Sequence, residues 1–264
     1  GLEILPAPYA LAHYRLSQVS EEKGHNPELE IYLTDTLSDQ LLDNRKAITN
    51  GFSEEQSYAS KSCTPPVRIV IGNPPSSNHP ANSAPRTIIN SQLMDFRPPK
   101  SEISDRQNIQ KALNNEAYRF LRWCCERILE NDKGIVSLVL PGAFARAVSF
   151  KYARKWISEK FHQVFILEVD GDARTNDATQ SIFSVLQGRL VLFGIRNEDN
   201  NSSFELYHKD ITNLTLEEKN TFLQKEAILL DFSRISFSDQ SYLFAPTNKY
   251  PEHEWSKYWP LVST

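Results

Sequence analysis

The sequence predicts an α/β fold built on a mostly parallel sheet. Apolar runs of strand length alternate with segments of helical period along most of the 264 residues, and strands that alternate with helices usually pair in parallel. Near the end of this pattern, the runs SIFSVLQ and RLVLFGIR are separated only by Gly188. This spacing predicts a hairpin, which adds an antiparallel member at the end of the sheet.

The composition limits the classes of protein to which this chain can belong. A hydrophobic content of 40% suits a globular domain, and a formal net charge of −4 argues against nucleic-acid binding through overall positive charge. No apolar run approaches the roughly 20 residues of a membrane-spanning helix, and no signal peptide is visible, so we expect a cytoplasmic protein without a membrane partner. No metal site is expected, because metal-type spacing is missing from the three cysteines, Cys63, Cys124 and Cys125.

The first half of the chain gives its elements in the following order. GLEIL is predicted as the last part of a strand, residues 6–19 as a helix, and residues 28–37 as a second strand. In the polar stretch that follows, SDQLLDNRK is predicted as a short helix and SEEQSYASKSCTPP as a loop. VRIVI, residues 67–71, is apolar on both faces, which predicts a fully buried strand. Residues 76–105, rich in Ser, Asn and Pro, predict a long mobile loop.

The second half begins with the strongest helix, over residues 105–131. Its apolar stripe comprises Ile109, Leu113, Ala117, Phe120 and Cys124, and Gly134 stops it. The remaining elements are a strand at 134–141, a helix at 149–161, a strand at 162–169, the hairpin, a strand at 205–211, and a helix at 215–228 that opens with a capping box of Thr215 and Glu218.

One local patch has positive charge. It comprises Arg146, Lys151, Arg154, Lys155 and Lys160, near the helix at 149–161. A patch of this kind can contact DNA phosphates, although a solvated helix face explains the same pattern.

The stretch Gly72-Asn73-Pro74-Pro75-Ser76 follows the buried strand at 67–71. Proline cannot donate to a sheet ladder and fixes φ, so the chain leaves the sheet here in a rigid, extended form. The carbonyls around Asn73 are therefore held at the carboxyl edge of the sheet, where ligands of open α/β sheets bind.

Several segments together resemble the Rossmann-like amino-methyltransferases that use S-adenosylmethionine. The likeness is to the γ-type N6-adenine DNA methyltransferase domain of type ISP and type IIG restriction-modification polypeptides, here truncated at its N-terminus. It rests on GLEILPAPYALAHYRL, IYLTDTL, IGNPPS, NNEAYRFLRW, GIVSLVLPGAF and DGDARTND, and covers roughly residues 1–196. It implies S-adenosylmethionine as cofactor, double-stranded DNA as partner, and nuclease and target-recognition domains in the same longer polypeptide.

The resemblance gives catalytic roles to the loop after the third strand. The Asn73 side-chain oxygen and the Pro74 carbonyl would accept the two amino hydrogens of the target adenine, which localises the nitrogen lone pair and stabilises the charge that develops. Pro75 would keep the loop rigid. An ordinary Asn-Pro-Pro turn is the structural alternative.

Ser76 departs from the family pattern, which places Tyr or Phe at this position to stack on the extruded base. Stacking is worth about 1–3 kcal/mol per base. Phe183 matches the family's second stacking position, on the opposite face of the base. Phe144 or His79 could replace the missing ring, although for Phe144 core packing is the preferred interpretation.

The cofactor residues implied by the resemblance lie near the first two strands. Glu3 stands where an acidic residue accepts hydrogen bonds from both ribose hydroxyls, and it would also favour the dipole of the following helix. Asp35 is the candidate acceptor for the adenine amino group of the cofactor, with Thr36 and Leu37 as pocket wall; a turn or N-cap role is its alternative.

These observations lead to an expected domain organisation and function. Residues 1–197 are expected to be a partial catalytic domain without the glycine-rich first motif, which would lie about 20 residues upstream of Glu3, and residues 198–264 a linker or the start of a target-recognition region. We expect this chain alone to be inactive. The expected reaction is methyl transfer to the N6 amine of adenine in a specific DNA sequence. The alternatives are methylation of a protein glutamine amide and a degenerate, non-catalytic scaffold.

Overall fold

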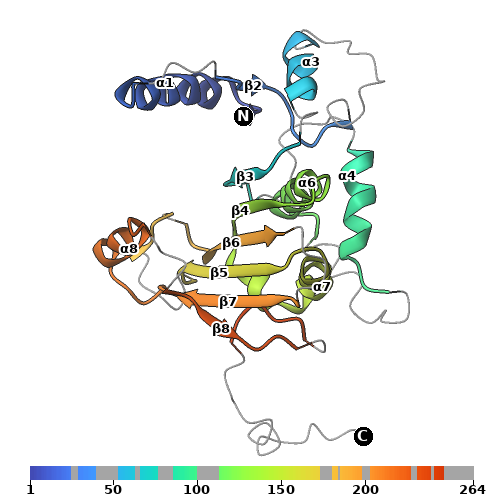
Figure 1. The fold of residues 1–264 in the computed structure, drawn as a ribbon, viewed down its shortest axis with the longest axis vertical. Helices are drawn as coiled ribbons and strands as arrows, with labels where there is room; N and C mark the ends of the chain where they lie inside the picture. Colours follow the sequence, from blue (N-terminus) through green and yellow to red (C-terminus); the bar gives the residue numbers. More distant parts are fainter. Residues whose placement is uncertain are drawn as a thin grey trace, which may run out of the picture. The chain divides into compact units, whose positions relative to one another are not determined.

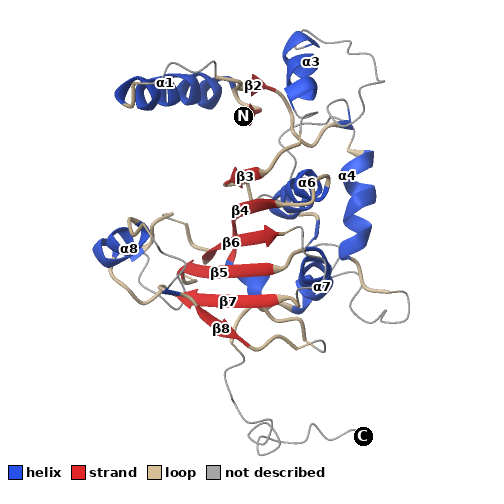
Figure 2. Cartoon of the chain, viewed as in Figure 1, coloured by secondary structure: helices blue, strands red, loops and turns tan. Residues whose placement is uncertain are grey.

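The computed structural model has the α/β architecture that the sequence predicts (Figures 1 and 2). It describes residues 1–24, 29–39, 53–62, 66–76, 86–99, 113–172, 180–183, 185–197, 203–226, 231–238 and 241–246. Its strands are β1 (Leu2–Glu3), β2 (Tyr32–Leu33), β3 (Ile69–Gly72), β4 (Gly134–Pro141), β5 (Gln163–Asp170), β6 (Arg189–Arg196), β7 (Glu205–Asp210) and β8 (Ser233–Ile235). Its α-helices are α1 (Pro6–Glu22), α3 (Ser53–Ser62), α4 (Thr87–Gln92), α6 (Glu116–Leu129), α7 (Lys151–Lys160) and α8 (Leu216–Leu223).

The main sheet is mixed, with the strand order β3-β4-β6-β5-β7-β8, and β1 and β2 form a separate parallel pair. β3 pairs with β4, and β5 with β7, in parallel, whereas β7 and β8 are antiparallel. The predicted hairpin is wrong, because residues 181–183 and 185–187 form bends or coil instead of a strand before β6. This segment is held by side-chain contacts at the end of β5, so its apolar alternation does not make it a ladder strand.

The chain divides into two compact units. One contains Gly1–Leu138 and Ile195–Asn200, and the other contains Val139–Gly194 and Asn201–Thr264. β4 and β6 contribute residues to both. Each unit is described by itself below.

In the first unit, α1 contacts β1 and β2, and α3 contacts β2. The predicted helix at 6–19 is confirmed, but its apolar residues Leu11, Tyr14 and Leu16 are 56%, 59% and 47% exposed. The predicted strand at 28–37 shrinks to two residues, Tyr32–Leu33. Of the helices in the described ranges, none has both the length and the apolar character needed to cross a membrane.

Two segments predicted as loops contain helices. Residues 53–62 form α3, whose Ala59 is fully buried. Within 76–105, α4 and the 3₁₀ turn Leu93–Phe96 bury a short apolar set, Ile89, Leu93 and Phe96. The predicted helix SDQLLDNRK lies almost entirely outside the described residues.

The start of α4 shows why the local sequence does not predict this helix. The backbone N–H groups of Thr87 and Ile88 donate to the two oxygens of Asp39, each at 2.9 Å. These N–H groups are orphans at any helix N-terminus and need an acceptor. Because the acceptor comes from 48 residues earlier in the chain, no capping residue is visible beside the helix.

The strand β3 is less buried than its sequence predicts. Ile69 and Ile71 are 61% and 80% exposed, although the strand was expected to be covered on both faces. β3 is an edge strand of the main sheet. Among the described elements it contacts β4 and α6. One face therefore lacks cover in the part of the chain that the structure describes.

Whereas α1 buries none of its side chains, helix α6 of the first unit buries many. It begins later than predicted because Asn115 caps it, its side-chain oxygen accepting from Ala117 N at 3.0 Å. Most of the predicted stripe is confirmed: Leu113, Ala117 and Cys124 are buried and Phe120 is half-buried, while Ile109 lies outside the described residues. Gly134 starts β4, where a Cβ atom would meet the Arg68 carbonyl oxygen at 2.8 Å.

The second unit contains β5, β7 and β8 side by side, with α8 near the carboxyl ends of β5 and β7 (Figure 2). The predicted strands at 162–169 and 205–211 and the helix at 149–161 correspond to β5, β7 and α7. The capping box of α8 is confirmed, with Thr215 and Glu218 bonding reciprocally. Arg154 is only 1% exposed and donates to the carbonyls of Phe144 and Ala147, so it is wrongly included in the predicted basic patch.

Glu168 of β5 holds a charged cluster within this unit. His208 Nε2 lies 2.6 Å from Glu168 Oε1, and Arg146 donates to both carboxylate oxygens. Burial alone would raise the pKa of Glu168, but the hydrogen bonds from His208 and Arg146 outweigh burial and lower the pKa to about 2.

We therefore expect the free energy of unfolding to depend on Glu168 at acid pH. A carboxylate whose pKa is depressed on folding stabilises the protein above its unfolded pKa, and this contribution is lost as the pH falls toward the folded value. The pKa falls from 4.5 to about 2, which corresponds to at most on the order of 3 kcal/mol. Glu168→Gln should flatten the loss of stability between about pH 5 and pH 2, measured by urea titration at each pH.

The matched control is Glu159→Gln, which removes an exposed carboxylate of α7 that lies 3.8 Å from Lys155. It should leave the acid dependence as in the parent protein. Equal slopes for Glu168→Gln and the parent would contradict the assigned role.

Candidate active site

Asn73 follows directly on the carboxyl end of β3, where Gly72 pairs with Leu138 of β4. Its side chain is exposed, and no hydrogen bond to it is found within the described ranges. Pro74 and Ser76 are half-buried and Pro75 is exposed. The amide oxygen of Asn73 is thus open to an external donor, at the edge of the sheet where the sequence analysis expected a ligand.

Glu3 lies at the end of β1 and turns its carboxylate toward the start of α1. Glu3 Oε1 accepts from Ile4 N at 2.8 Å and from Leu5 N at 2.9 Å. The other oxygen, Oε2, has no protein partner among the residues that the structure describes. The alternative role at the helix start is therefore observed, and it leaves one oriented oxygen for an external hydroxyl.

The strand pairing brings the predicted cofactor residues close together. Glu3 is opposite Leu33 in the β1–β2 register, and Thr34 N donates to the Glu3 carbonyl at 2.7 Å. Asp35 follows directly. Since β1 and β2 are parallel, Glu3 and Asp35 both belong to the carboxyl ends of this pair.

Asp35 is the centre of a buried charge network. It is 7% exposed, and its Oδ2 accepts from Arg86 Nη2 at 3.0 Å. Arg86 also bonds Glu116, the first residue of α6. Burial alone would lower the pKa of Arg86, but the two carboxylates outweigh it and raise the pKa.

Asp35 also makes the local turn that was its alternative role, because its Oδ1 accepts from Leu37 N at 3.0 Å. Thr36 and Leu37, the predicted pocket wall, are 7% and 0% exposed. Each carboxylate oxygen has two lone pairs, so Asp35 retains acceptor capacity despite its partners. The adenine contact stays a prediction.

Phe183 belongs to the second unit, where it is half-buried in the segment before β6. Its backbone N–H donates to Asp170 Oδ2 at 3.1 Å. Asp170 is the last residue of β5 and forms a buried ion pair with Lys219 of α8, Nζ to Oδ1 at 3.0 Å. Sequence reasoning assigned neither residue a role: Asp170 entered only as the first residue of the motif DGDARTND. Lys219 has the pattern of an ordinary solvent-facing lysine.

Burial alone would raise the pKa of Asp170, but the hydrogen bonds that it accepts from Phe183 N, Ser181 and Ile182 N and from Lys219 outweigh burial and lower the pKa. Asp170 is therefore a carboxylate at neutral pH. The ammonium group of Lys219 balances its charge.

Two glycines allow the chain to close tightly after Phe183. A Cβ atom on Gly188 would lie 2.8 Å from the Asp170 carbonyl oxygen, and one on Gly142 would lie 3.2 Å from the Gly188 carbonyl carbon. Gly142 N donates to Gly188 O at 2.7 Å. The loop after β4 and the segment before β6 thus meet backbone to backbone; a Cβ atom at Gly188 would force the backbone to shift, and one at Gly142 would make a tight contact.

Neither candidate for the missing stacking ring gains support. Phe144 is fully buried and packs against Phe150 and Phe244 at ring-centroid distances of 5.7 and 6.2 Å, which confirms the core interpretation. His79 lies outside the described residues.

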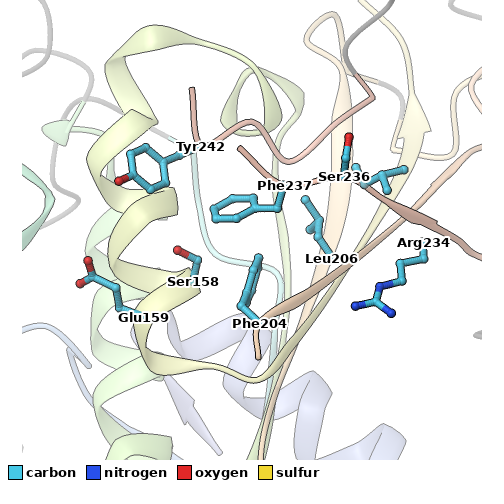
Figure 3. A pocket seen from close by; sticks show the side chains of 9 residues that line it. Ser158, Glu159, Phe204, Leu206, Arg234, Ser236, Phe237 and Tyr242 are labelled. Atoms are coloured by element: carbon cyan, nitrogen blue, oxygen red, sulfur yellow. The ribbon is translucent and has the colours of Figure 1, made fainter. Parts of the chain in front are cut away.

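A hollow of about 560 Å³ lies elsewhere in the second unit (Figure 3). Its lining comprises Ser158, Glu159, Phe204, Leu206, Arg234, Ile235, Ser236, Phe237 and Tyr242. None of the predicted site residues is among them. Residues 239–240, between two of its lining segments, are outside the described ranges, so no role is assigned to this hollow.

Among the family models none matches the sequence, and no curated protein matches it. Solved structures do match. They include a nuclease-deletion mutant of the Type ISP restriction-modification enzyme LlaGI in complex with a DNA substrate mimic, with a TM-score of 0.75 and 20% identity over 100% of this chain and 25% of that one. The DrdV–DNA complex has a TM-score of 0.72 and 21% identity over 96% of this chain and 25% of that one.

A third match is the ATP-dependent Type ISP restriction-modification enzyme LlaBIII bound to DNA, with a TM-score of 0.72 and 18% identity over 91% of this chain and 17% of that one. The chain spans a quarter or less of each of these three proteins. At this level of identity, what the comparison shows is a common fold.

Replacing Gly188 by alanine tests the close approach at Asp170. The new Cβ atom would lie 2.8 Å from a backbone oxygen, so the loop must move, at a cost of about 1–3 kcal/mol in the free energy of unfolding. Thermal and urea unfolding measure the effect. Leu186→Ala, at a side chain 79% exposed in the same segment, should be nearly neutral; an equally neutral Gly188→Ala would disprove the tight contact.

Proposed function

We propose that this chain is the catalytic part of a DNA methyltransferase of a restriction-modification system, which transfers a methyl group from S-adenosylmethionine to the N6 amine of adenine. The observation that carries the proposal is the exposed Asn73, followed by Pro74-Pro75, at the carboxyl end of β3. The fold shared with the restriction-modification enzymes LlaGI and LlaBIII supports it.

The chemistry needs two acceptors in fixed positions. The adenine amine is poorly nucleophilic because its lone pair is conjugated with the ring. When Asn73 Oδ1 and the Pro74 carbonyl accept its two hydrogens, the lone pair becomes localised on nitrogen, and the positive charge of the transition state is stabilised. As the new N–C bond forms, the S–CH₃ bond breaks and its electrons stay on sulfur; one amine proton then leaves to solvent.

S-adenosylmethionine supplies the electrophilic methyl group when it is bound. We propose that Glu3 holds the ribose hydroxyls, since one oxygen is fixed by the start of α1 and the other has no partner among the described residues. Asp35 would receive the adenine amino group on its remaining lone pairs. Because Thr36 and Leu37 are buried, they would contact the cofactor through their main chain or after a local movement.

Double-stranded DNA is the proposed partner: LlaBIII and DrdV are bound to DNA in their structures, and LlaGI is in complex with a DNA substrate mimic. Target-recognition and nuclease parts would belong to the same longer polypeptide. We propose residues 1–197 as the catalytic part and 198–264 as the connection to target recognition. This connection contains β7, which pairs with β5 and so extends the sheet.

A second candidate function is a non-catalytic scaffold, and one observation favours it. Ser76 stands where the resembling enzymes place a stacking ring, and Phe144, one candidate replacement, is fully buried in the core. The free Asn73 side chain favours catalysis instead.

The test is to express the complete protein in cells without adenine methylation and to map N6-methyladenine by sequencing their DNA. We expect methylation at one sequence motif. Asn73→Ala should lower it by a factor of about 100 or more, because one of two fixed acceptors is lost, while the exposed Asn90→Ala on α4 should leave it unchanged. Unmethylated DNA in cells that express the parent protein would favour the scaffold function. Near-normal methylation by Asn73→Ala would contradict the proposed mechanism.

A further inference from the structure

The segment that carries Phe183 has no ladder of its own. Residues 181–183 form bends and coil between β5 and β6, so main-chain pairing in the sheet does not fix the ring. Short loops of this kind hold a geometry only when other groups satisfy their polar backbone atoms. The contacts of residues 180–183 show which groups do so.

The carboxylate of Asp170 is the common acceptor. Ser181 Oγ donates to Oδ2 at 2.8 Å, Ile182 N to Oδ1 at 3.1 Å and Phe183 N to Oδ2 at 3.1 Å. Three consecutive residues are therefore bound to one side chain at the end of β5. The main-chain oxygen of Asp170 also lies against Gly188, at the other end of the segment.

Lys219 completes this arrangement from α8. Its Nζ donates to Asp170 Oδ1 at 3.0 Å and to the Gln180 carbonyl at 2.7 Å, and its side chain is 2% exposed. Gln180 is bound to the same helix a second time, because its Oε1 accepts from Leu216 N at 2.8 Å. The lysine thus neutralises the buried carboxylate and binds the residue that precedes the segment.

We infer that Lys219 and Asp170 are positioning residues that hold Phe183 in place for stacking on the extruded base. This inference rests on the proposed function, since it gives the buried ion pair a task in that reaction. The bonds involve the backbone of Gln180, Ile182 and Phe183 and the side chains of Gln180 and Ser181, and none of them involves the ring of Phe183. A ring fixed in advance loses less conformational entropy when the base arrives.

A double-mutant cycle on the complete protein separates positioning from mere stability. The probe is a duplex that contains the mapped methylation motif with 2-aminopurine at the target adenine, whose fluorescence rises when the base leaves the stack. Phe183→Ala, Lys219→Met and the double variant are compared by this fluorescence and by the KM for unmodified DNA. Lys225→Met is the matched control, because Lys225 is 48% exposed, pairs with Asp231 at 2.7 Å and lies 4.9 Å from the centroid of the Phe222 ring, and neither partner belongs to the segment at 180–183.

We expect Phe183→Ala and Lys219→Met each to raise the KM for DNA about tenfold, consistent with the loss of one stacked ring, and to reduce the fluorescence rise. The double variant should be no worse than Phe183→Ala, since both changes remove the same contact. The affinity for S-adenosylmethionine should change less than twofold, and Lys225→Met should match the parent. If Lys219→Met fails to fold, Asp170→Asn with Lys219→Met leaves no unpaired buried charge and should show the same loss.

Normal base extrusion by a folded Lys219 variant, or losses that multiply in the double variant, would overturn the inference while leaving the proposed function intact. If Phe183→Ala itself has no effect, the stacking role and the anchor both fail. The effect of Asn73→Ala on methylation still reports on the proposed reaction separately.

Discussion

Buried carboxylates at the ends of strands hold the loops of this protein. A charged group removed from water must be paired and hydrogen-bonded, so each such carboxylate fixes several partners at once. Asp35 after β2 binds Arg86, which in turn binds the start of α6. Asp39 caps α4, and Asp170 at the end of β5 binds three consecutive residues and Lys219. Segments without ladder pairing acquire defined positions in this way.

The same constraint shapes the candidate site. In the first unit, Glu3 and Asp35 are oriented by the backbone N–H groups of their own turns, and acceptor capacity remains for an external ligand. Asn73 differs, because no described residue bonds its side chain, and the two prolines that follow it restrict only the backbone. In the proposed site, the acceptor on Asn73 would therefore remain available to a substrate, while the internal hydrogen bonds hold Glu3 and Asp35.

The shared fold and the candidate chemistry rest on different kinds of support. Structural similarity over nearly the whole chain at about 20% identity reports on strand order and packing. The proposed methyl transfer depends instead on particular side chains, above all Asn73, and on Ser76, where the stacking ring of the resembling enzymes is replaced. A shared fold does not by itself establish a shared function, which depends on the residues of the site.

Most elements, the position of the Asn-Pro-Pro loop at the carboxyl end of a strand, the packing of Phe144 in the core and the capping box of α8 were predictable from the sequence. These features depend on local periodicity and on residues close in sequence. The start of α4, the burial of Lys219 and Arg154, the exposure of β3 and the absence of a hairpin before β6 depend instead on contacts that form on folding. Their partners, among them Asp39, Asp170 and the Phe144 carbonyl, are distant along the chain or adjacent only after folding. A lysine that neutralises a buried carboxylate has the same sequence pattern as one that faces water, and only packing distinguishes them.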